Sequence, residues 1–134
     1  MTTPDDAARQ QAAELNAADG SLRPLGIDIS AVAVGRATAT MTVTAPMLQG
    51  HGSCHGGYLF LLADSAFAFA CNTRGAAAVA AGADIEFLAP AQLGDLLVAT
   101  AVERVVRGRT GLYDVTVRRG DEVLAEFRGR SRSR

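Results

Sequence analysis

The spacing of hydrophobic and polar residues differs from segment to segment along the chain, and each spacing predicts either a helix or a strand. Residues 4–18 begin with a proline and two acids, are rich in alanine, and are followed by Gly20 and Pro24, which predicts a first helix. From Arg36 to Thr44 the residues alternate, with alanine, methionine and valine on one face and mostly threonine on the other. A period of two is typical of a half-buried strand.

A second helix is expected from Gly57 to about Arg74, and it is apolar around almost its whole circumference. The stretch Tyr58–Cys71 reads YLFLLADSAFAFAC, in which only Asp64 and Ser65 are strongly polar. A helix that is apolar all round is a buried helix. Either the sheet must therefore curl around this helix, or a second subunit must cover it.

The rest of the chain is predicted to form strands. Alternating apolar residues indicate strands at 78–88, 96–107, 112–119 and 122–130, with a shorter β-like segment at 27–34. The glycine-containing turns between the later strands are short, which implies antiparallel pairing. One buried helix followed by an antiparallel sheet is an α+β layer architecture. We expect an N-terminal helix and lead-in at 1–24, one domain at 25–130, and a flexible basic tail at 131–134.

Composition and charge narrow the classes of protein. With 134 residues, 49% hydrophobic and 20% charged, the chain is predicted to be one globular domain. A net charge of −1 provides no basic field that would attract nucleic acid. The polar, acidic N-terminus is unlike a signal peptide, and the apolar run is too short and too interrupted to span a membrane. We therefore expect a cytoplasmic protein without a nucleic-acid or membrane partner.

The most informative residue is Asp64, a single acid inside the apolar helix. Burying an unpaired carboxylate costs several kcal/mol and raises its pKa. Just before the helix stand His55, Gly56 and Gly57, and the glycines offer bare backbone N–H groups at a helix N-terminus, where an oxyanion would bind. A poised acid and an oxyanion site are the parts needed to hydrolyse an acyl bond.

The spacing of these residues indicates a shared site. Gly56 and Asp64 are separated by about 12 Å along the helix axis, which is too far for both to contact one acyl group. Two antiparallel helices related by a dimer axis would bring Gly56 of one chain opposite Asp64 of the other.

The segment HGGYLFLLADSAFAFACN at 55–72 resembles the hotdog-fold acyl-CoA thioesterases of the phenylacetic-acid-degradation (PaaI) type, and MLQGHGSCHGG and FLAPAQLGDLLVATAVE extend the likeness. The resemblance covers roughly residues 25–130. It implies an antiparallel sheet wrapped around the central helix and a homodimer with shared active sites, usually paired into a homotetramer. It also implies hydrolysis of aryl- or acyl-CoA thioesters without a metal or redox cofactor.

By the same resemblance, Asp64 would activate water or attack the carbonyl itself. The Gly56 amide would bind the thioester carbonyl oxygen, and His55 would shape the loop or orient the substrate. Gln49 stands where many relatives carry an Asn whose amide helps hold the water or thioester, and the longer Gln keeps that amide for the same catalytic role. Some relatives carry a hydroxyl near Gly82 that this chain lacks, so the supporting contacts differ from the family pattern.

Three further residues are expected to help bind substrate. Gly57 adds a second bare amide, and Ser65 either contacts the substrate or bonds back to a helix carbonyl. Arg109 lies at a predicted turn, where a cation would meet CoA phosphates. Arg107 and Arg128 are further candidates for the same role, and for all three arginines a solvated charge at a strand edge is an equally good explanation.

The cysteines and histidines suggest two other chemistries. His51, Cys54, His55 and Cys71 fit no common zinc spacing, so no metal site is expected. Cys54 as a nucleophile lacks an evident third partner, and adjacent side chains such as Cys54 and His55 rarely point together.

The expected substrates are phenylacetyl-CoA and its ring-hydroxylated relatives, in aromatic (phenylacetate) catabolism. One alternative is a thioesterase for another aryl-CoA or a medium-chain acyl-CoA. Another is a non-catalytic acyl-CoA-binding module. A dehydratase on the same fold is less favoured, because that chemistry typically needs a catalytic histidine paired with an acid in a different loop.

Overall fold

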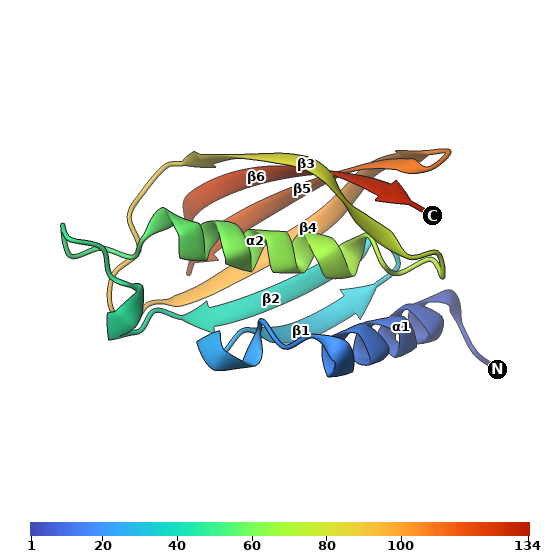
Figure 1. The fold of residues 1–134 in the computed structure, drawn as a ribbon, viewed down its shortest axis with the longest axis horizontal. Helices are drawn as coiled ribbons and strands as arrows, with labels where there is room; N and C mark the ends of the chain where they lie inside the picture. Colours follow the sequence, from blue (N-terminus) through green and yellow to red (C-terminus); the bar gives the residue numbers. More distant parts are fainter.

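A computed structural model describes residues 1–134, in which two helices accompany one sheet (Figure 1). In chain order the elements are α1 Pro4–Ala18, the 3₁₀ turn η1 Arg23–Leu25, β1 Asp28–Ala33, β2 Arg36–Thr42, the 3₁₀ turn η2 Ala45–Met47, α2 Gly56–Ala70, β3 Ala78–Phe87, β4 Leu96–Arg107, β5 Thr110–Arg119 and β6 Glu122–Ser133. No helix is both long and apolar enough to cross a membrane.

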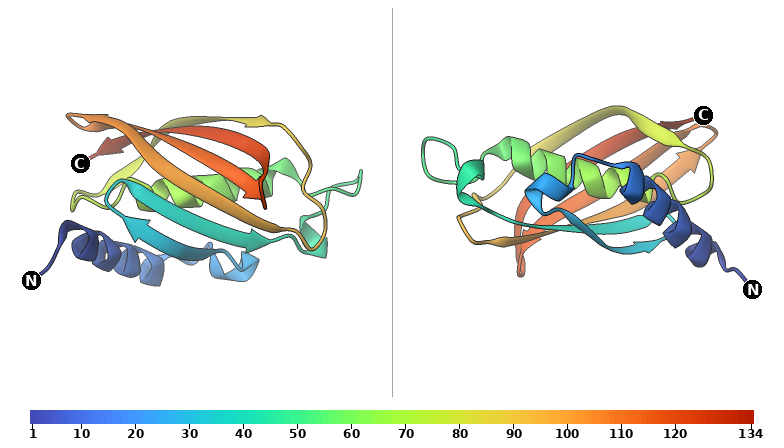
Figure 2. Two further views of the ribbon diagram at one scale, coloured as in Figure 1. Left: turned by 180° about the vertical axis from the view of Figure 1, so that it is seen from behind. Right: turned by 60° about the horizontal axis from the view of Figure 1, so that its bottom comes forward.

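The six strands form one sheet in the order β1-β2-β4-β5-β6-β3, and every neighbouring pair is antiparallel. The sheet curves around α2, which lies along its concave face (Figures 1 and 2). Arg107 pairs with Thr110, so the β4–β5 turn is only two residues long, and Gly108 supplies the positive φ of 61° that this turn needs. This architecture confirms the expected α+β hotdog fold.

Small side chains let α2 lie close to the sheet. Ala63, Ala66 and Ala70 of the helix are fully buried, as are Ala37 and Ala39 of β2. Larger rings fill the opposite side of the core, where Phe67 packs at ring-centroid distances of 5.6 Å from Tyr113 and 5.9 Å from Phe127. A side chain at Gly129 would lie 2.8 Å from the Phe67 ring, so only glycine leaves room for that ring on β6.

α1 is the predicted first helix, with the predicted bounds. The Thr3 hydroxyl accepts the Asp6 N–H, and the Asp6 carboxylate accepts the Thr3 N–H, which forms a capping box. The helix packs against β1 through the buried Ala8 and Ala12. It therefore lies on the opposite side of α2 from β3 (Figure 1).

Two boundaries differ from the prediction by more than two residues. α2 ends at Ala70 instead of about residue 74, because the Asn72 side chain closes the helix by donating to the Ala68 and Ala78 carbonyls. The flexible tail expected at 131–134 is wrong, because β6 continues to Ser133 and stays paired on both sides. Ser131 faces Ala80 of β3 and Gly111 of β5 and is only 5% exposed. Two flanking strands satisfy the backbone groups of this segment and hold it in the sheet.

Candidate active site

Asp64 lies in the middle of α2 and is half-buried. No hydrogen bond in the chain uses its carboxylate, and desolvation by the surrounding apolar residues raises its pKa above the ordinary value. It borders a cavity of about 250 Å³ between α1, α2 and the start of β3. The other lining residues are Leu15, Asp19, Leu22, Ser65, Phe67, Ala68, Phe69, Cys71, Asn72, Ala78, Val79 and Ala80. This acid is thus desolvated, unpaired and accessible from a cavity.

The N-terminus of α2 separates the roles of the two glycines. His55 is the N-cap residue, and its Nδ1 accepts the Gly57 N–H at 2.8 Å. Gly57 is therefore engaged in capping the helix. Gly56, in contrast, donates its N–H to no group of the chain. Of the two amides, the Gly56 amide is the one that can bind an oxyanion without breaking an existing bond.

Gly56 borders a different cavity from Asp64. This cavity has a volume of about 460 Å³ and is lined by Ser53, Cys54, Gly56, Leu59, Phe87, Leu88, Ala89, Pro90 and Ala91. The Phe87 ring covers Gly56 so closely that a Cβ at position 56 would lie 2.9 Å from its tip. Phe87 was not among the predicted site residues, because its contact with Gly56 arises only when β3 runs back alongside α2.

Gln49 braces its own loop. Its side-chain amide nitrogen donates to the Ser53 hydroxyl at 2.8 Å, and its side-chain oxygen accepts the His51 N–H at 2.5 Å. Its backbone also pairs with Ser53 and Gly52. The amide that resembles the family's Asn is thus occupied in holding residues 49–53, the loop ahead of the α2 N-cap.

The remaining predicted residues are Ser65 and three arginines. The Ser65 hydroxyl donates to the Leu61 carbonyl at 2.7 Å, the local bond that helix hydroxyls commonly form. Arg109 lies exposed at the β4–β5 turn and donates through Nε to the Ser133 carbonyl at 3.0 Å. Arg128 forms two hydrogen bonds to the Asp114 carboxylate and is thereby engaged, whereas Arg107 has no such partner.

The cysteines show none of the features of a nucleophile. Burial raises the pKa of the Cys54 thiol above its ordinary value and that of the Cys71 thiol to about 11. The thiolate is the reactive form, so both groups stay protonated and unreactive near neutral pH. No group of three or more His, Cys, Asp or Glu side chains is arranged to hold a metal ion.

The structure brings together only part of the predicted site within one chain. His55, Gly56, Gly57 and the Gln49 loop gather at the N-terminus of α2. Asp64 and Ser65 share a second cavity further along the helix. Leu15, Asp19 and Leu22 border the same cavity as Asp64 and were not predicted as site residues, because nothing in their local sequence indicates where α1 packs.

Comparison with known proteins places the chain in a family. Residues 51–126 match the model of the thioesterase superfamily. The acyl-coenzyme A thioesterase PaaI of Escherichia coli is 53% identical over 84% of this chain and 81% of its own length.

Solved structures give the same result. The structure of Escherichia coli PaaI, from the phenylacetic acid degradation operon, superposes with a TM-score of 0.96 at 47% identity and covers 98% of this chain and 96% of that one. A Streptococcus mutans protein bound to acetyl-CoA has a TM-score of 0.77 at 26% identity and covers 81% of this chain and 88% of its own. These matches confirm the enzyme class expected from the sequence, an acyl-CoA thioesterase. The chain therefore belongs to the thioesterase superfamily, as a hotdog-fold member of the PaaI type.

Proposed function

We propose that this chain hydrolyses aryl-CoA thioesters, such as phenylacetyl-CoA or a ring-hydroxylated phenylacetyl-CoA, to the free acid and CoA. The observation that carries the proposal is Asp64, a desolvated carboxylate without a partner at the edge of a cavity. The similarity to PaaI of Escherichia coli, a protein of the phenylacetic acid degradation operon, supports the aryl substrate and a role in aromatic catabolism.

The proposed reaction needs a base and an oxyanion donor. Asp64 takes a proton from water, and the hydroxyl adds to the thioester carbonyl carbon while the Gly56 N–H stabilises the carbonyl oxygen. Collapse of the intermediate breaks the C–S bond, and the proton on Asp64 passes to the departing thiolate. In the second route the Asp64 carboxylate attacks the carbonyl carbon and the C–S bond breaks, which releases CoA thiolate and leaves an acyl-aspartyl anhydride. Water then hydrolyses the anhydride to the free acid and the Asp64 carboxylate, and the proton released passes to the thiolate. Neither route requires a metal or redox cofactor.

We further propose that each site is shared by two protomers. Gly56 and Asp64 border different cavities of one chain, so one chain alone does not unite them. β3 is an edge strand paired only with β6, and Val79 and Phe87 along it are 52% and 54% exposed. Pairing of two β3 edges about a two-fold axis would continue the sheet and run the two α2 helices antiparallel. We propose that such dimers associate into homotetramers in the cytoplasm.

The other predicted residues receive supporting roles in this proposal. Gln49 and His55 hold the loop and the helix N-terminus that present the Gly56 amide, with Gly57 as the capped amide beside it. Ser65 forms part of the wall of the Asp64 cavity.

Arg109 keeps its two terminal guanidinium nitrogens free of partners within the chain and would meet the CoA phosphates. We also propose residues 25–130 as the catalytic domain, with 1–24 as its N-terminal lead-in.

The first test is release of free CoA thiol from phenylacetyl-CoA, hexanoyl-CoA and acetyl-CoA. The proposal expects turnover, with the highest kcat/KM for phenylacetyl-CoA. A preference for hexanoyl-CoA would instead identify a medium-chain thioesterase. Binding of CoA without turnover of any thioester would identify an acyl-CoA-binding module, a function that the occupied Gln49 amide would then explain.

A pair of variants at position 56 isolates the amide. Proline lacks the N–H but suits the first turn of a helix, and His55 before it already has an extended ψ of 134°. Gly56→Ala adds a Cβ against Phe87 as proline does, yet it keeps the N–H. The proposal expects kcat of Gly56→Pro to lie about 100-fold below that of Gly56→Ala. Equal rates would remove the Gly56 amide from the mechanism.

Mixed dimers test whether the site is shared. A dimer of one Asp64→Asn chain and one Gly56→Pro chain, purified through two different affinity tags, keeps one site with both groups intact if each site uses two protomers. The proposal therefore expects about half of the wild-type activity, from two chains that are each inactive as homodimers. A mixed dimer as inactive as its parents would show that each chain supplies a whole site.

A further inference from the structure

The end of α1 and the turn after it form one wall of the Asp64 cavity. Leu15 and Asp19 are half-buried there, and Leu22 is only 2% exposed. These three residues line the cavity from α1 and the turn after it, whereas Ala78–Ala80 line it from β3. The wall therefore comes from a part of the chain far from the residues that carry the thioesterase resemblance.

This wall is held in place by its own hydrogen bonds. Asp19 Oδ1 accepts both the N–H and the hydroxyl of Ser21, at 2.7 and 2.6 Å. The Arg23 guanidinium donates to the Asn16 and Asp19 carbonyls at the C-terminus of α1. The Leu22 carbonyl accepts two backbone N–H groups from the residues that follow. Leu22 and Asp19 are thus fixed before any ligand enters.

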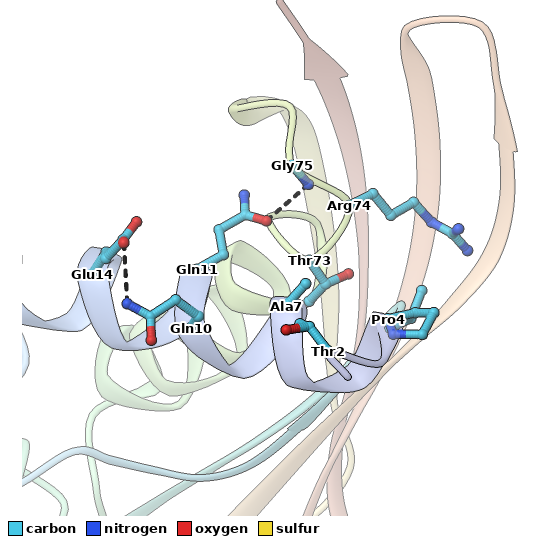
Figure 3. Close-up of a pocket in the computed structure, with 10 residues that line it drawn as sticks. Thr2, Pro4, Ala7, Gln10, Gln11, Glu14, Thr73, Arg74 and Gly75 are labelled. Atoms are coloured by element: carbon cyan, nitrogen blue, oxygen red, sulfur yellow. Dashed lines mark hydrogen bonds between the residues drawn. The ribbon is translucent and has the colours of Figure 1, made fainter.

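The rest of α1 is held by contacts that do not involve Leu15. Figure 3 shows a cavity between α1 and the loop after α2, of about 660 Å³, across which Gln11 accepts the Gly75 N–H at 2.9 Å. A further cavity of about 300 Å³ lies between part of α1 and β1 and is lined in part by Ile29. Because α1 is anchored mainly through Ala8 and Ala12, a change at Leu15 leaves those contacts intact.

The size and charge of the cavity select among acyl groups. An engineered apolar cavity of about 150 Å³ holds benzene, so 250 Å³ has room for one aromatic ring with a short linker, and Leu15 and Leu22 line the side of the cavity that α1 and the turn after it form. Asp19 Oδ2 has no partner in the chain, and Asp64 lies on the same cavity. Two carboxylates repel an acyl group that carries a negative charge of its own.

We infer that Leu15, Asp19 and Leu22 determine acyl specificity: the leucines limit the length of the acyl group, and the Asp19 carboxylate excludes anionic acyl groups. The favoured class is compact and uncharged, of the size of one aryl ring. This inference rests on the proposed function, because it takes Asp64 as the group that acts on the thioester.

The test compares kcat/KM for phenylacetyl-CoA, decanoyl-CoA and glutaryl-CoA in the wild type and in Leu15→Ala. Shortening Leu15 should raise the ratio of decanoyl-CoA to phenylacetyl-CoA activity about tenfold, the usual effect of a few methylene groups in an apolar pocket. Ile29→Ala is the matched control, because Ile29 packs beside α1 but lines a different cavity. It should leave that ratio unchanged. A ratio in Leu15→Ala equal to that of the wild type would overturn the length assignment.

Asp19→Asn tests the charge. Asparagine keeps an oxygen for the Ser21 hydrogen bonds and removes the negative charge. Activity on glutaryl-CoA should rise about fivefold, with phenylacetyl-CoA unchanged. No gain on glutaryl-CoA would overturn the charge assignment.

Failure of the proposed function gives a different pattern. In that case the wild type would hydrolyse none of the three thioesters, or Asp64→Asn would retain full activity, and the specificity inference would fall with it. Normal wild-type turnover that depends on Asp64, with unchanged ratios in the Leu15 and Asp19 variants, would remove this inference alone.

Discussion

Two acids of this chain, Asp64 and Glu103, lie in opposite environments. Glu103 on β4 accepts hydrogen bonds from Arg74 at 3.1 and 2.8 Å and from the Tyr113 hydroxyl at 3.1 Å. These bonds, chiefly those from Arg74, hold its pKa below the ordinary value despite partial burial. Asp64 on α2 has no such partner, and burial alone raises its pKa.

The difference indicates that Glu103 has a structural role, whereas Asp64 is suited to catalysis. Glu103 on β4 links Arg74, in the segment after α2, to Tyr113 on β5. Because the Glu103 carboxylate already accepts these hydrogen bonds, its pKa is lowered and it is a weak base. Asp64 is kept apart from cations and donors and retains the basicity that general-base catalysis near neutral pH requires.

The largest expected effect is on catalysis at Asp64. Asp64→Asn keeps the shape and removes the base, so kcat on phenylacetyl-CoA should fall by about a thousandfold or more. Glu103→Gln, the same change at the paired acid, should keep kcat within about twofold. Release of CoA thiol measures both, and equal losses in the two variants would abolish the distinction.

A cation placed beside Asp64 should lower its pKa, as Arg74 lowers the pKa of Glu103. Ala68 is one helical turn away and borders the same cavity, so Ala68→Lys places an ammonium beside Asp64. The wild-type kcat/KM should fall as the pH falls through the Asp64 pKa, which lies above 3.8, because the base must be ionised.

In Ala68→Lys that acidic limb should move to lower pH, with about tenfold less activity at pH 7. Ala68→Met is the control, since it fills similar space without charge. A limb in the same place in the Lys and Met variants would mean that another group controls the pH profile.

Glu103, in contrast to Asp64, should stabilise the folded protein. Glu103→Gln removes the charge that Arg74 and Tyr113 bind and should lower the free energy of unfolding at pH 7 by about 1–2 kcal/mol. The folded pKa of Glu103 is depressed, so its stabilisation is present above the unfolded value of 4.5 and is lost as the pH falls through the folded value.

Urea unfolding at pH 7 and at pH 3 measures this effect, and the difference between wild type and Glu103→Gln should shrink at pH 3. Glu126→Gln is the control, because Glu126 accepts only from the Thr116 hydroxyl and is exposed. A loss as large in Glu126→Gln would show that the network around Glu103 is not special.

The smallest expected effect is on the stability of the Asp64→Asn variant, and it is a gain instead of a loss. The folded pKa of Asp64 is raised, so in the window between 3.8 and that value the folded state binds more protons, and stability falls as the pH rises. Asp64→Asn should therefore raise Tm at pH 7 by about 2 °C, an advantage that disappears below pH 3.8. Thermal unfolding monitored by circular dichroism would reveal it, and a lower Tm would mean that Asp64 has a stabilising partner in the oligomer.

Much of the fold followed from local pattern. α1 has the predicted bounds because alanine content, a proline and first-turn acids act within a few residues. β4 also matches its prediction, because alternation continues to a glycine turn. The end of α2 did not follow, since the Asn72 side chain stops it through a bond to Ala78, outside the helix.

The sequence by itself determined the α+β class, the central buried helix and the presence of one acid in apolar surroundings. These depend on the composition and period of short segments. Only the tertiary structure decided that Asp64 has no partner, that His55 occupies the Gly57 amide while Gly56 stays free, and that Asp19 and Leu22 border the same cavity as Asp64. Such facts depend on which distant segments come together in space, and contacts of that kind leave no periodic signal in the chain.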